Sequence, residues 1–285
     1  MAESTRDIKR RIKGITSTKQ ITKAMEMVAS AKLRKARLQL DRSRPYYRTV
    51  LENIQSVLSS TNNIRHPFLE KREVKNSLYI ILAADRGLAG GYNSNIFKIA
   101  ESKIKHKKDE TSLIVVGIRA REYFKRRGYN IVESFVGINE VPSFADAQKI
   151  ANPALKMFLN KEIDEINLVY TEFVGTLSYV PTVMKILPSE NVDKKKDGPN
   201  VLVEFEPSPE EVLDHLIPEY INSTIFGALI ESSSSEQAAR RFAMSAATEN
   251  AEEMIDDLQL NYNRARQAAI TSELSEIVTG AEALK

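Results

Sequence analysis

A single helical pattern that runs from about residue 4 to residue 58 constrains the fold most. Its apolar residues recur at steps of three and four, which predicts a narrow apolar stripe along one side of a helix. The stripe consists of Ile8, Ile12, Ile15, Ile21, Met25, Val28, Leu33, Ala36 and Leu40. At ~1.5 Å per residue such a helix is about 80 Å long. No compact domain of this size has a core that long, so we expect the stripe to face another long helix.

Local signals agree with this helix. Ser4 stands three residues before Asp7, and a serine so placed can cap the free N–H groups of a first helical turn. Gly14 and Pro45 are the only helix-breaking residues within the pattern. Because proline removes a backbone donor and clashes with the preceding turn, we expect Pro45 to kink or interrupt the helix.

The other end of the chain, residues 208–285, is predicted to be a second long helix. Ser208 precedes Pro209, an arrangement typical of an N-cap followed by proline at the first helical position. Four serines at residues 232–235 lower helix propensity and predict a kink or a cap. The expected inner face consists of Leu229, Ala239, Phe242, Ala246, Met254, Leu258, Tyr262, Ala265, Ala269, Leu274 and Ile277.

Between these ends, residues 76–190 alternate short apolar runs with helical stretches. Residues 77–84 (SLYIILAA) are typical of a strand buried on both faces. Further strands are expected at 112–116, 129–135, 166–174 and 179–187, and a tight turn at Gly175 is expected to join the last two. Helices are expected to end near residues 105, 127 and 160. Ser143 and Asp146 open the last of these helices. This alternation predicts a Rossmann-like α/β domain around a mostly parallel sheet.

The two helical ends carry opposite charge. Residues 1–50 hold fourteen Lys and Arg against four Asp and Glu, whereas residues 208–285 hold fourteen Asp and Glu against five Lys and Arg. We therefore predict α/β plus long helices: an antiparallel coiled coil of residues 1–58 and 208–285, with residues 76–190 inserted as the α/β domain. The C-terminal helix is the longer one, so a tip of about 30 Å extends past its partner. Such a tip needs an external surface, because an isolated helix is marginal in water.

Composition excludes several kinds of function. The chain has no Cys, and its three His residues are scattered, so the sequence predicts neither a disulfide framework nor a metal site. No apolar run approaches the ~20 residues that cross a bilayer. The basic N-terminus has no apolar core segment, and apolar periodicity already begins at Ile8, so we expect no removable leader.

Four blocks of the sequence resemble the gamma subunits of F-type ATP synthases. They are residues 21–37 (ITKAMEMVASAKLRKAR), 85–93 (DRGLAGGYN), 235–250 (SEQAARRFAMSAATEN) and 258–284 (LQLNYNRARQAAITSELSEIVTGAEAL). The resemblance implies a non-catalytic rotor shaft without a cofactor. Its implied partners are a hexamer of three alpha and three beta chains, the epsilon subunit and the membrane-embedded ring of c subunits. It further implies a peripheral protein on the cytoplasmic face of a bacterial membrane, which touches the membrane only through the c ring.

The resemblance also implies roles for individual residues. In the family, the block that holds Arg266 and Gln267 bonds a loop of one beta subunit, and Thr271 and Glu273 are expected to add polar contacts. Met25 and Arg86 match further positions near the beta subunits, and core packing explains Met25 equally well. The expected apolar end that turns inside the hexamer consists of Ile270, Leu274, Ile277 and Val278. Phe205 and Glu206 are expected near the c ring and the epsilon subunit.

Two other functions fit parts of the sequence. One is an enzyme built on the α/β domain, because the glycine-rich turn at residues 85–91 follows a strand as phosphate-binding turns do. Its spacing matches neither common phosphate-binding motif, so we do not expect nucleotide there. The other is a scaffold or nucleic-acid binder that uses the basic N-terminal helix. The acidic helix predicted beside it argues against nucleic acid, because it would repel phosphate.

Overall fold

The computed structural model describes residues 5–60, 67–68, 70, 72–138, 141–176, 178–188 and 208–283. The chain divides into two compact units. The first unit combines Met1–Ala29 with Arg240–Lys285, and the second is Ser30–Ala239. Two long helices, α1 (Thr5–Ser60) and α5 (Pro209–Ala283), contribute to both units. Both predicted helices are therefore confirmed, with ends close to the expected ones.

The N-terminus of α5 is capped as the sequence predicts. The backbone N–H of Glu211 donates to Ser208 Oγ at 3.2 Å. Of the two predicted effects of Pro45, the interruption is wrong, since α1 continues through this residue, and the kink stays a prediction. Proline removes one helical N–H, but its carbonyl still accepts the Thr49 hydroxyl at 3.1 Å. Leu40 before it and Val50 after it are both buried, so packing on either side holds the helix together.

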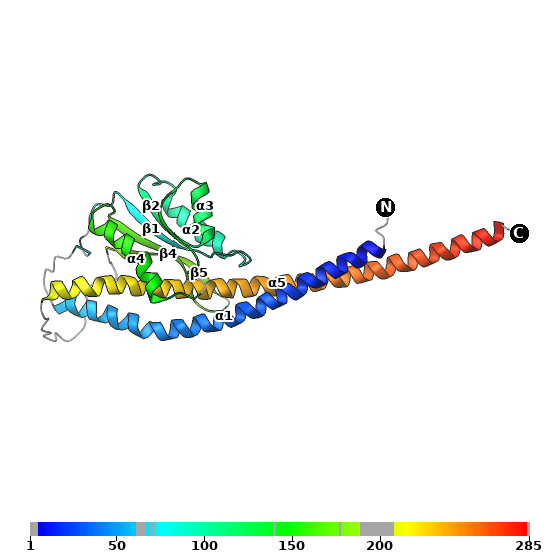
Figure 1. Cartoon of the computed structure of the whole chain (residues 1–285), viewed down its shortest axis with the longest axis horizontal. Coiled ribbons are helices and arrows are strands. Elements are labelled where there is room, and N and C mark those ends of the chain that lie inside the picture. The colour runs from blue at the N-terminus through cyan, green and yellow to red at the C-terminus, as the bar shows by residue number, and fades with distance from the viewer. Residues whose placement is uncertain are drawn as a thin grey trace. The chain divides into compact units, whose positions relative to one another are not determined.

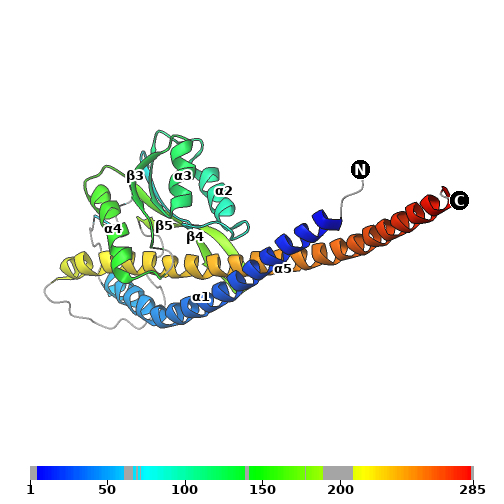
Figure 2. The same ribbon diagram turned by 45° about the vertical axis from the view of Figure 1, so that its right-hand side comes forward.

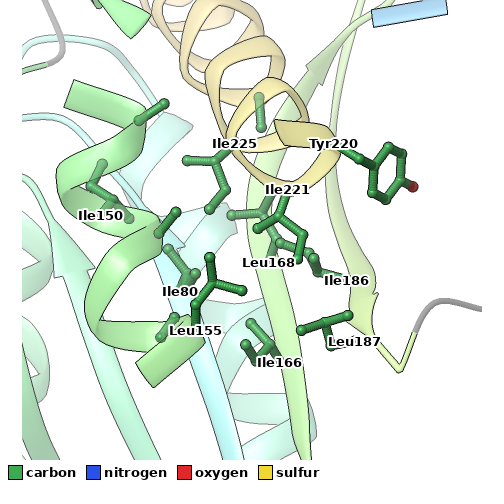
Figure 3. Close-up of a cluster of buried hydrophobic side chains, with 14 of the residues drawn as sticks. Ile80, Ile150, Leu155, Ile166, Leu168, Ile186, Leu187, Tyr220, Ile221 and Ile225 are labelled. Atoms are coloured by element: carbon green, nitrogen blue, oxygen red, sulfur yellow. The ribbon is translucent and has the colours of Figure 1, made fainter. Parts of the chain in front are cut away.

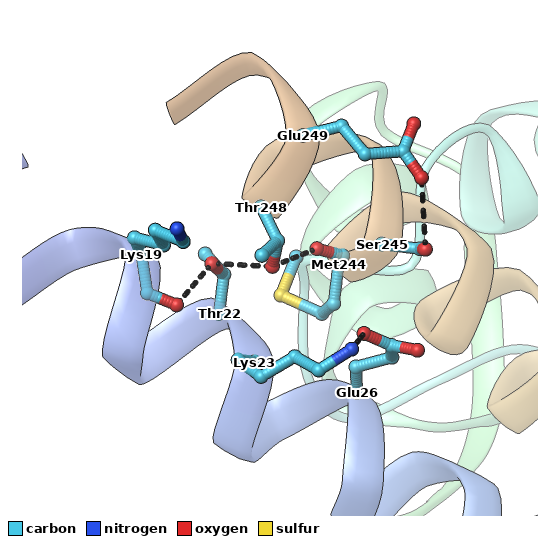
Figure 4. Close-up of polar contacts among 8 residues, drawn as sticks. All are labelled: Lys19, Thr22, Lys23, Glu26, Met244, Ser245, Thr248 and Glu249. Carbon is cyan, nitrogen blue, oxygen red and sulfur yellow. Dashed lines mark hydrogen bonds and ion pairs between the residues drawn. The ribbon is translucent and has the colours of Figure 1, made fainter. Parts of the chain in front are cut away.

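In the first unit, α1 and α5 run side by side in opposite directions (Figures 1 and 2). Buried hydroxyl groups meet at the centre of this pair, where Thr22 Oγ1 and Thr248 Oγ1 lie 2.8 Å apart (Figure 4). Each hydroxyl also lies within hydrogen-bond distance of a carbonyl of its own helix, Lys19 or Met244. Each hydroxyl has a single proton, so one donates across the pair while the other donates to its own helix. The predicted antiparallel coiled coil is thus confirmed.

The apolar faces of this pair differ in part from the predicted stripes. Ile8 and Leu258 are buried as expected. However, Ile21 is 61% exposed and Phe242 is 67% exposed, and Val28 and Met254 are also exposed, so these four assignments to an inner face are wrong. Small residues occupy the buried positions instead, because the facing helix can cover a small side chain completely. They include Thr22, Ala29, Thr248 and Ala251.

The second unit is built on one five-stranded sheet in the order β3-β2-β1-β4-β5. Its strands are β1 (Ser77–Leu82), β2 (Thr111–Val116), β3 (Asn130–Phe135), β4 (Glu165–Phe173) and β5 (Tyr179–Leu187). β3, β2, β1 and β4 pair with one another in parallel, and β5 pairs with β4 in the antiparallel direction. The predicted, mostly parallel sheet is confirmed, including the hairpin whose turn at Gly175 bonds to Ser178.

Helices cover both faces of the sheet. Along β1, alternate residues face opposite sides, because side chains alternate across a strand. Tyr79 and Ile81 pack with α2 (Tyr92–Ile104) and α3 (Ile118–Arg126). Leu78, Ile80 and Leu82 pack with α4 (Phe144–Leu159) and with α1 and α5. Figure 3 shows this second layer, which includes Ile80, Ile150, Leu155, Ile166, Leu168, Ile186, Leu187, Tyr220, Ile221 and Ile225.

The four serines of α5 form no kink and no cap, so that prediction is wrong. They lie within an uninterrupted helix and are almost completely buried. Ser232 Oγ accepts the N–H of Thr171 at 3.3 Å, and the Ser232 carbonyl accepts the Tyr92 hydroxyl at 3.1 Å. The Ser235 hydroxyl donates to the Thr171 carbonyl at 3.3 Å. Because these groups are bonded to β4 and α2, serine is favoured here despite its modest helix propensity.

Candidate partner-binding site

The C-terminal end of α5 has no helical partner among the described residues. In the first unit Lys19 Nζ lies 2.6 Å from Glu252 Oε1, and Thr22 pairs with Thr248. The residue numbers of two facing residues on α1 and α5 therefore add up to 271 or 270. By the same register Thr5, where α1 begins, faces about residue 266. The segment from there to Ala283 is about 25 Å long at ~1.5 Å per residue. The predicted unpaired tip is therefore present in the described structure.

The Lys19–Glu252 pair joins the basic helix to the acidic one, as the charge pattern predicts. The hydrogen bond from Lys19, followed by its charge, lowers the pKa of the Glu252 carboxyl group below its ordinary value. Since solvent screens exposed ion pairs, this pair selects the alignment and contributes little to holding the helices together.

The polar residues predicted to bind a partner lie on this tip. Arg266, Gln267 and Glu273 are exposed. Thr271 is exposed as well, but its hydroxyl already donates to the Gln267 carbonyl at 2.9 Å. At about 100° per residue, Arg266 and Glu273 share one side of the helix with Ile270 and Ile277. The tip thus presents two charged groups of opposite sign within one face.

The four apolar residues of the predicted bearing are exposed. Their exposed fractions lie between 46% and 67% for Ile270, Leu274, Ile277 and Val278. Together with the polar residues named above they cover an arc of about 160°. Full burial of such an aliphatic side chain contributes about 1.5–3 kcal/mol. Clustered exposed apolar side chains mark interaction surfaces, so this face is suited to a protein collar.

The remaining predicted residues are not gathered at the tip. Met25 is half-buried on α1 and by register faces about residue 245, which is roughly 30 Å along the helix from Arg266. Arg86 is exposed in the loop after β1 and belongs to the second unit. Phe205 and Glu206 lie outside the described residues.

Sequence patterns missed a second exposed apolar set on the first unit. Ile21, Met27 and Val28 on α1 and Phe242, Met254 and Leu260 on α5 are all at least half exposed. The sequence did contain a signal for this set: each helix has more apolar residues than the single stripe that a two-helix pair needs. Additional apolar positions around the helices indicate that the pair itself is enclosed by other chains.

The glycine-rich turn after β1 begins with a carboxylate, Asp85, that accepts two backbone hydrogen bonds. Asp85 Oδ1 accepts the N–H of Ile118 at 2.8 Å, and Asp85 Oδ2 accepts the N–H of Gly137 at 2.7 Å. Ile118 is the first residue of α3, and the N-terminus of a helix attracts anions because its free N–H groups and its dipole point there. The Asp85 carboxylate therefore occupies the position that an anionic ligand would take.

Among the described residues, no three His, Cys, Asp or Glu side chains gather in an arrangement that could hold a metal ion. In the same part of the chain, no helix has an apolar stretch sufficient to span a membrane.

Comparisons with known proteins cover the full length of the chain. The family model described as ATP synthase matches residues 4–284. The ATP synthase gamma chain of Alkaliphilus metalliredigens is 52% identical over 291 residues, with 100% of both chains covered. The sodium-ion-specific ATP synthase gamma chain of Acetobacterium woodii is 46% identical over 302 residues, again with 100% of both covered.

Solved structures have the same fold. A chain in the central stalk/c-ring structure of the Tetrahymena thermophila mitochondrial ATP synthase is 25% identical, with a TM-score of 0.60, and the match covers 80% of this chain and 99% of that one. A chain in the Euglena gracilis mitochondrial ATP synthase structure (OSCP/F1/c-ring, rotational state 3) is 19% identical, with a TM-score of 0.71 and coverage of 98% and 94%. At 19% identity the second match shows the fold alone.

Proposed function

The chain belongs to the ATP synthase gamma chain family, and from that premise we propose that it is the central rotor shaft of an F-type ATP synthase. It couples ion-driven rotation of the membrane c ring to ATP synthesis, or the reverse, at sites on the beta subunits. The chain itself supplies no catalytic group. It transmits rotation, and its asymmetry forces the catalytic sites through different conformations.

One observation carries this proposal: the first unit exposes apolar residues beyond those that its two helices bury together. Phe242 on α5 and Ile21 on α1 lie outside the paired faces, and Leu274 and Ile277 lie on the unpaired tip. A free two-helix rod with so many exposed apolar groups would tend to associate. Enclosure within a larger assembly removes this surface from water.

The proposed partners are the hexamer of three alpha and three beta chains, the epsilon subunit and the c ring. The hexamer encloses the first unit. The Tetrahymena chain of similar fold comes from an assembly described as central stalk/c-ring, which supports these partners. The shaft reaches the membrane only through the c ring, and we place it at the cytoplasmic face of a bacterial membrane.

Arg266 is the proposed anchor of the tip on one beta subunit. Its guanidinium is exposed and can form a bidentate pair with a carboxylate, which fixes both position and direction. Gln267, Thr271 and Glu273 add polar contacts nearby, while Ile270, Leu274, Ile277 and Val278 form an apolar bearing. Apolar contact is not directional, so it allows the tip to turn inside its collar. Met25 and Arg86 are proposed as further contacts with beta subunits.

Assembly with purified alpha and beta chains tests the rotor function directly. We expect one copy of this chain to co-purify with three copies of each, and the complex to hydrolyse ATP while turning this chain. A full-length chain that fails to join alpha and beta, although it is folded by circular dichroism, would refute the proposal.

Arg266→Ala tests the anchor, and Arg264→Ala is its matched control. Both arginines are exposed on α5, but they point about 200° apart around the helix. Within the assembled enzyme, Arg266→Ala should slow ATP-driven ion pumping while Arg264→Ala leaves it near the unmodified rate. Equal pumping rates in the two variants would remove the assignment of Arg266 without affecting the rotor function.

A further inference from the structure

The second unit contains a cavity of about 380 Å³ between α1, α4, the β4–β5 hairpin and α5. Pockets that hold small organic ligands are typically about 300–1,000 Å³. Tyr46, which is 51% exposed, borders the cavity, so the cavity meets solvent beside this ring. A small molecule can therefore enter it from one side.

Aromatic rings and a thioether supply much of the wall. The rings of Phe144 and Phe226 are 5.7 Å apart and nearly perpendicular. These two residues border the cavity together with Tyr46, Tyr170 and Met184. Aromatic rings attract one another in edge-to-face and offset arrangements, and a thioether sulfur also attracts a ring. The wall is therefore complementary to an aromatic body.

Three hydroxyl groups of the wall already use their protons. Ser43 and Thr224 donate to carbonyls of their own helices, at 3.0 Å and 2.8 Å. The Tyr46 hydroxyl donates to the Glu219 carboxylate. Because a hydroxyl group has a single proton, none of these three has one left for a molecule in the cavity.

Two further polar atoms at the wall, Ser223 Oγ and Glu231 Oε2, are buried and expose almost no surface to the cavity. Glu231 is moreover already engaged in an interaction within the chain. A charged molecule in this space would lose its hydration without gaining a counter-ion from the described wall residues, which is strongly unfavourable. The cavity therefore favours an uncharged occupant.

Gly227 leaves room for such an occupant. It borders the cavity from the interior of α5, and a Cβ atom added there would meet nothing within 4 Å. Glycine is the least favourable residue in a helix interior apart from proline. A larger apolar residue at this position would both favour the helix and fill part of the space. The glycine is explained if the space itself has a use.

From this arrangement we propose that the cavity binds a small uncharged molecule with an aromatic body. The ring of this molecule packs against Phe144 and Phe226, and its body lies over the open side of Gly227. Burial of its apolar surface supplies the affinity. The site is separate from the residues proposed to contact other chains and does not depend on the rotor function.

The test uses the full-length chain and propylbenzene as the probe. Two molecules with the same skeleton and a charge at its end are the matched controls, the cation phenylpropylammonium and the anion phenylpropanoate. Methionine methyl groups are labelled with ¹³C, and the signal of Met184, which lines the cavity, is assigned with Met184→Leu. We expect propylbenzene to shift the Met184 signal saturably. The signal of Met157, which lies on α4 outside the wall, should move little.

Variants and charged controls separate the parts of the proposal. Gly227→Leu should fill the cavity and weaken binding of propylbenzene on the order of tenfold or more, whereas the matched control Gly227→Ala should retain it. Circular dichroism shows whether both variants keep their helices. Phenylpropylammonium and phenylpropanoate should each bind at least about tenfold more weakly than propylbenzene, because their charges would have to leave water.

Four results would overturn the proposal. Absence of a saturable Met184 shift would show that the cavity takes no such ligand. Undiminished binding to a folded Gly227→Leu variant would place the probe elsewhere. Binding of either charged control as tight as that of propylbenzene would refute the uncharged class of ligand. A Met184 shift that follows the protein concentration without any probe would assign the cavity to a second copy of the chain.

Discussion

Removing the carboxylate of Asp85 tests the idea that this side chain occupies an anion position at the ends of the parallel strands. Asp85→Ala leaves the N–H groups of Ile118 and Gly137 without their acceptor. A hydrogen bond to a charged group contributes about 1.5–3 kcal/mol. Gly137 is exposed, so water replaces most of its bond, whereas Ile118 N is partly buried. With about 0.3–1 kcal/mol from the charge at the start of α3, the expected cost is roughly 2–4 kcal/mol.

Hydrogen exchange measures this cost where it arises. At roughly 2 kcal/mol, the amide of Ile118 should exchange about 30-fold faster in Asp85→Ala than in the unmodified chain. Asp109→Ala, which removes another acidic group of the second unit, is the control and should change the rate little, because Asp109 is exposed. Sulfate, compared with chloride at equal ionic strength, should restore protection in Asp85→Ala and have little effect on the unmodified chain. Exchange of Ile118 within twofold of the unmodified rate would refute the reasoning.

Three further predictions concern local packing and pH. Gly117 has φ of +98°, and a Cβ there would lie 2.3 Å from the Ala83 carbonyl oxygen, so Gly117→Ala should destabilise the chain by at least about 3 kcal/mol in urea unfolding. The control Gly137→Ala, at φ of +76° but with nothing within 4 Å, should cost only about 1–2 kcal/mol. Thr22→Val and Thr248→Val should each lower the free energy of unfolding by about 1 kcal/mol. The double variant should lose less than the sum of the two single losses, because it leaves neither hydroxyl without its partner. Strictly additive losses would contradict a bond between the two hydroxyls. In the folded chain the pKa of Glu252 is lowered, so the folded state favours the ionised carboxyl group. The resulting stabilisation is present at pH values above the ordinary pKa of this group and is lost as the pH falls through its folded-state pKa. The melting temperature of the unmodified chain should therefore exceed that of Glu252→Gln at pH 7 and converge with it in acid.

The sequence predicted elements well wherever a local signal and the hydrophobic period agreed. The capping box at Ser143 and Asp146, the turn at Gly175 and the N-cap at Ser208 are all found where they were expected. Local propensity misled where tertiary contacts compensate for it. Pro45 is held within α1 by packing on both sides, and the serines at 232–235 are bonded to neighbouring elements.

The faces of the long helices could not be fully predicted, for a physical reason. Apolar periodicity identifies residues that avoid water, but it does not say which partner covers them. Phe242 and Met254 fit a stripe that faces α1, yet both are exposed in this chain. Conversely, Thr22 and Thr248 are buried, although neither belongs to the apolar pattern. The roles of Arg266, Met25 and Arg86 depend on contacts with other chains, so they remain predictions.

The polar contacts of the two long helices suit a shaft that transmits torque. In the first unit Thr22 meets Thr248, and in the second Ser232 and Ser235 bond to Thr171. Apolar packing alone resists separation of two helices but opposes their sliding or turning only weakly, because burial has no preferred direction. Hydrogen bonds depend on angle as well as distance, so they fix the rotation of each helix about its axis. Both helices continue without a break across the boundary between the units, at Ala29 and Ala239. Rotation imposed on one unit is therefore carried to the other by two continuous backbones, each held in register by directional bonds.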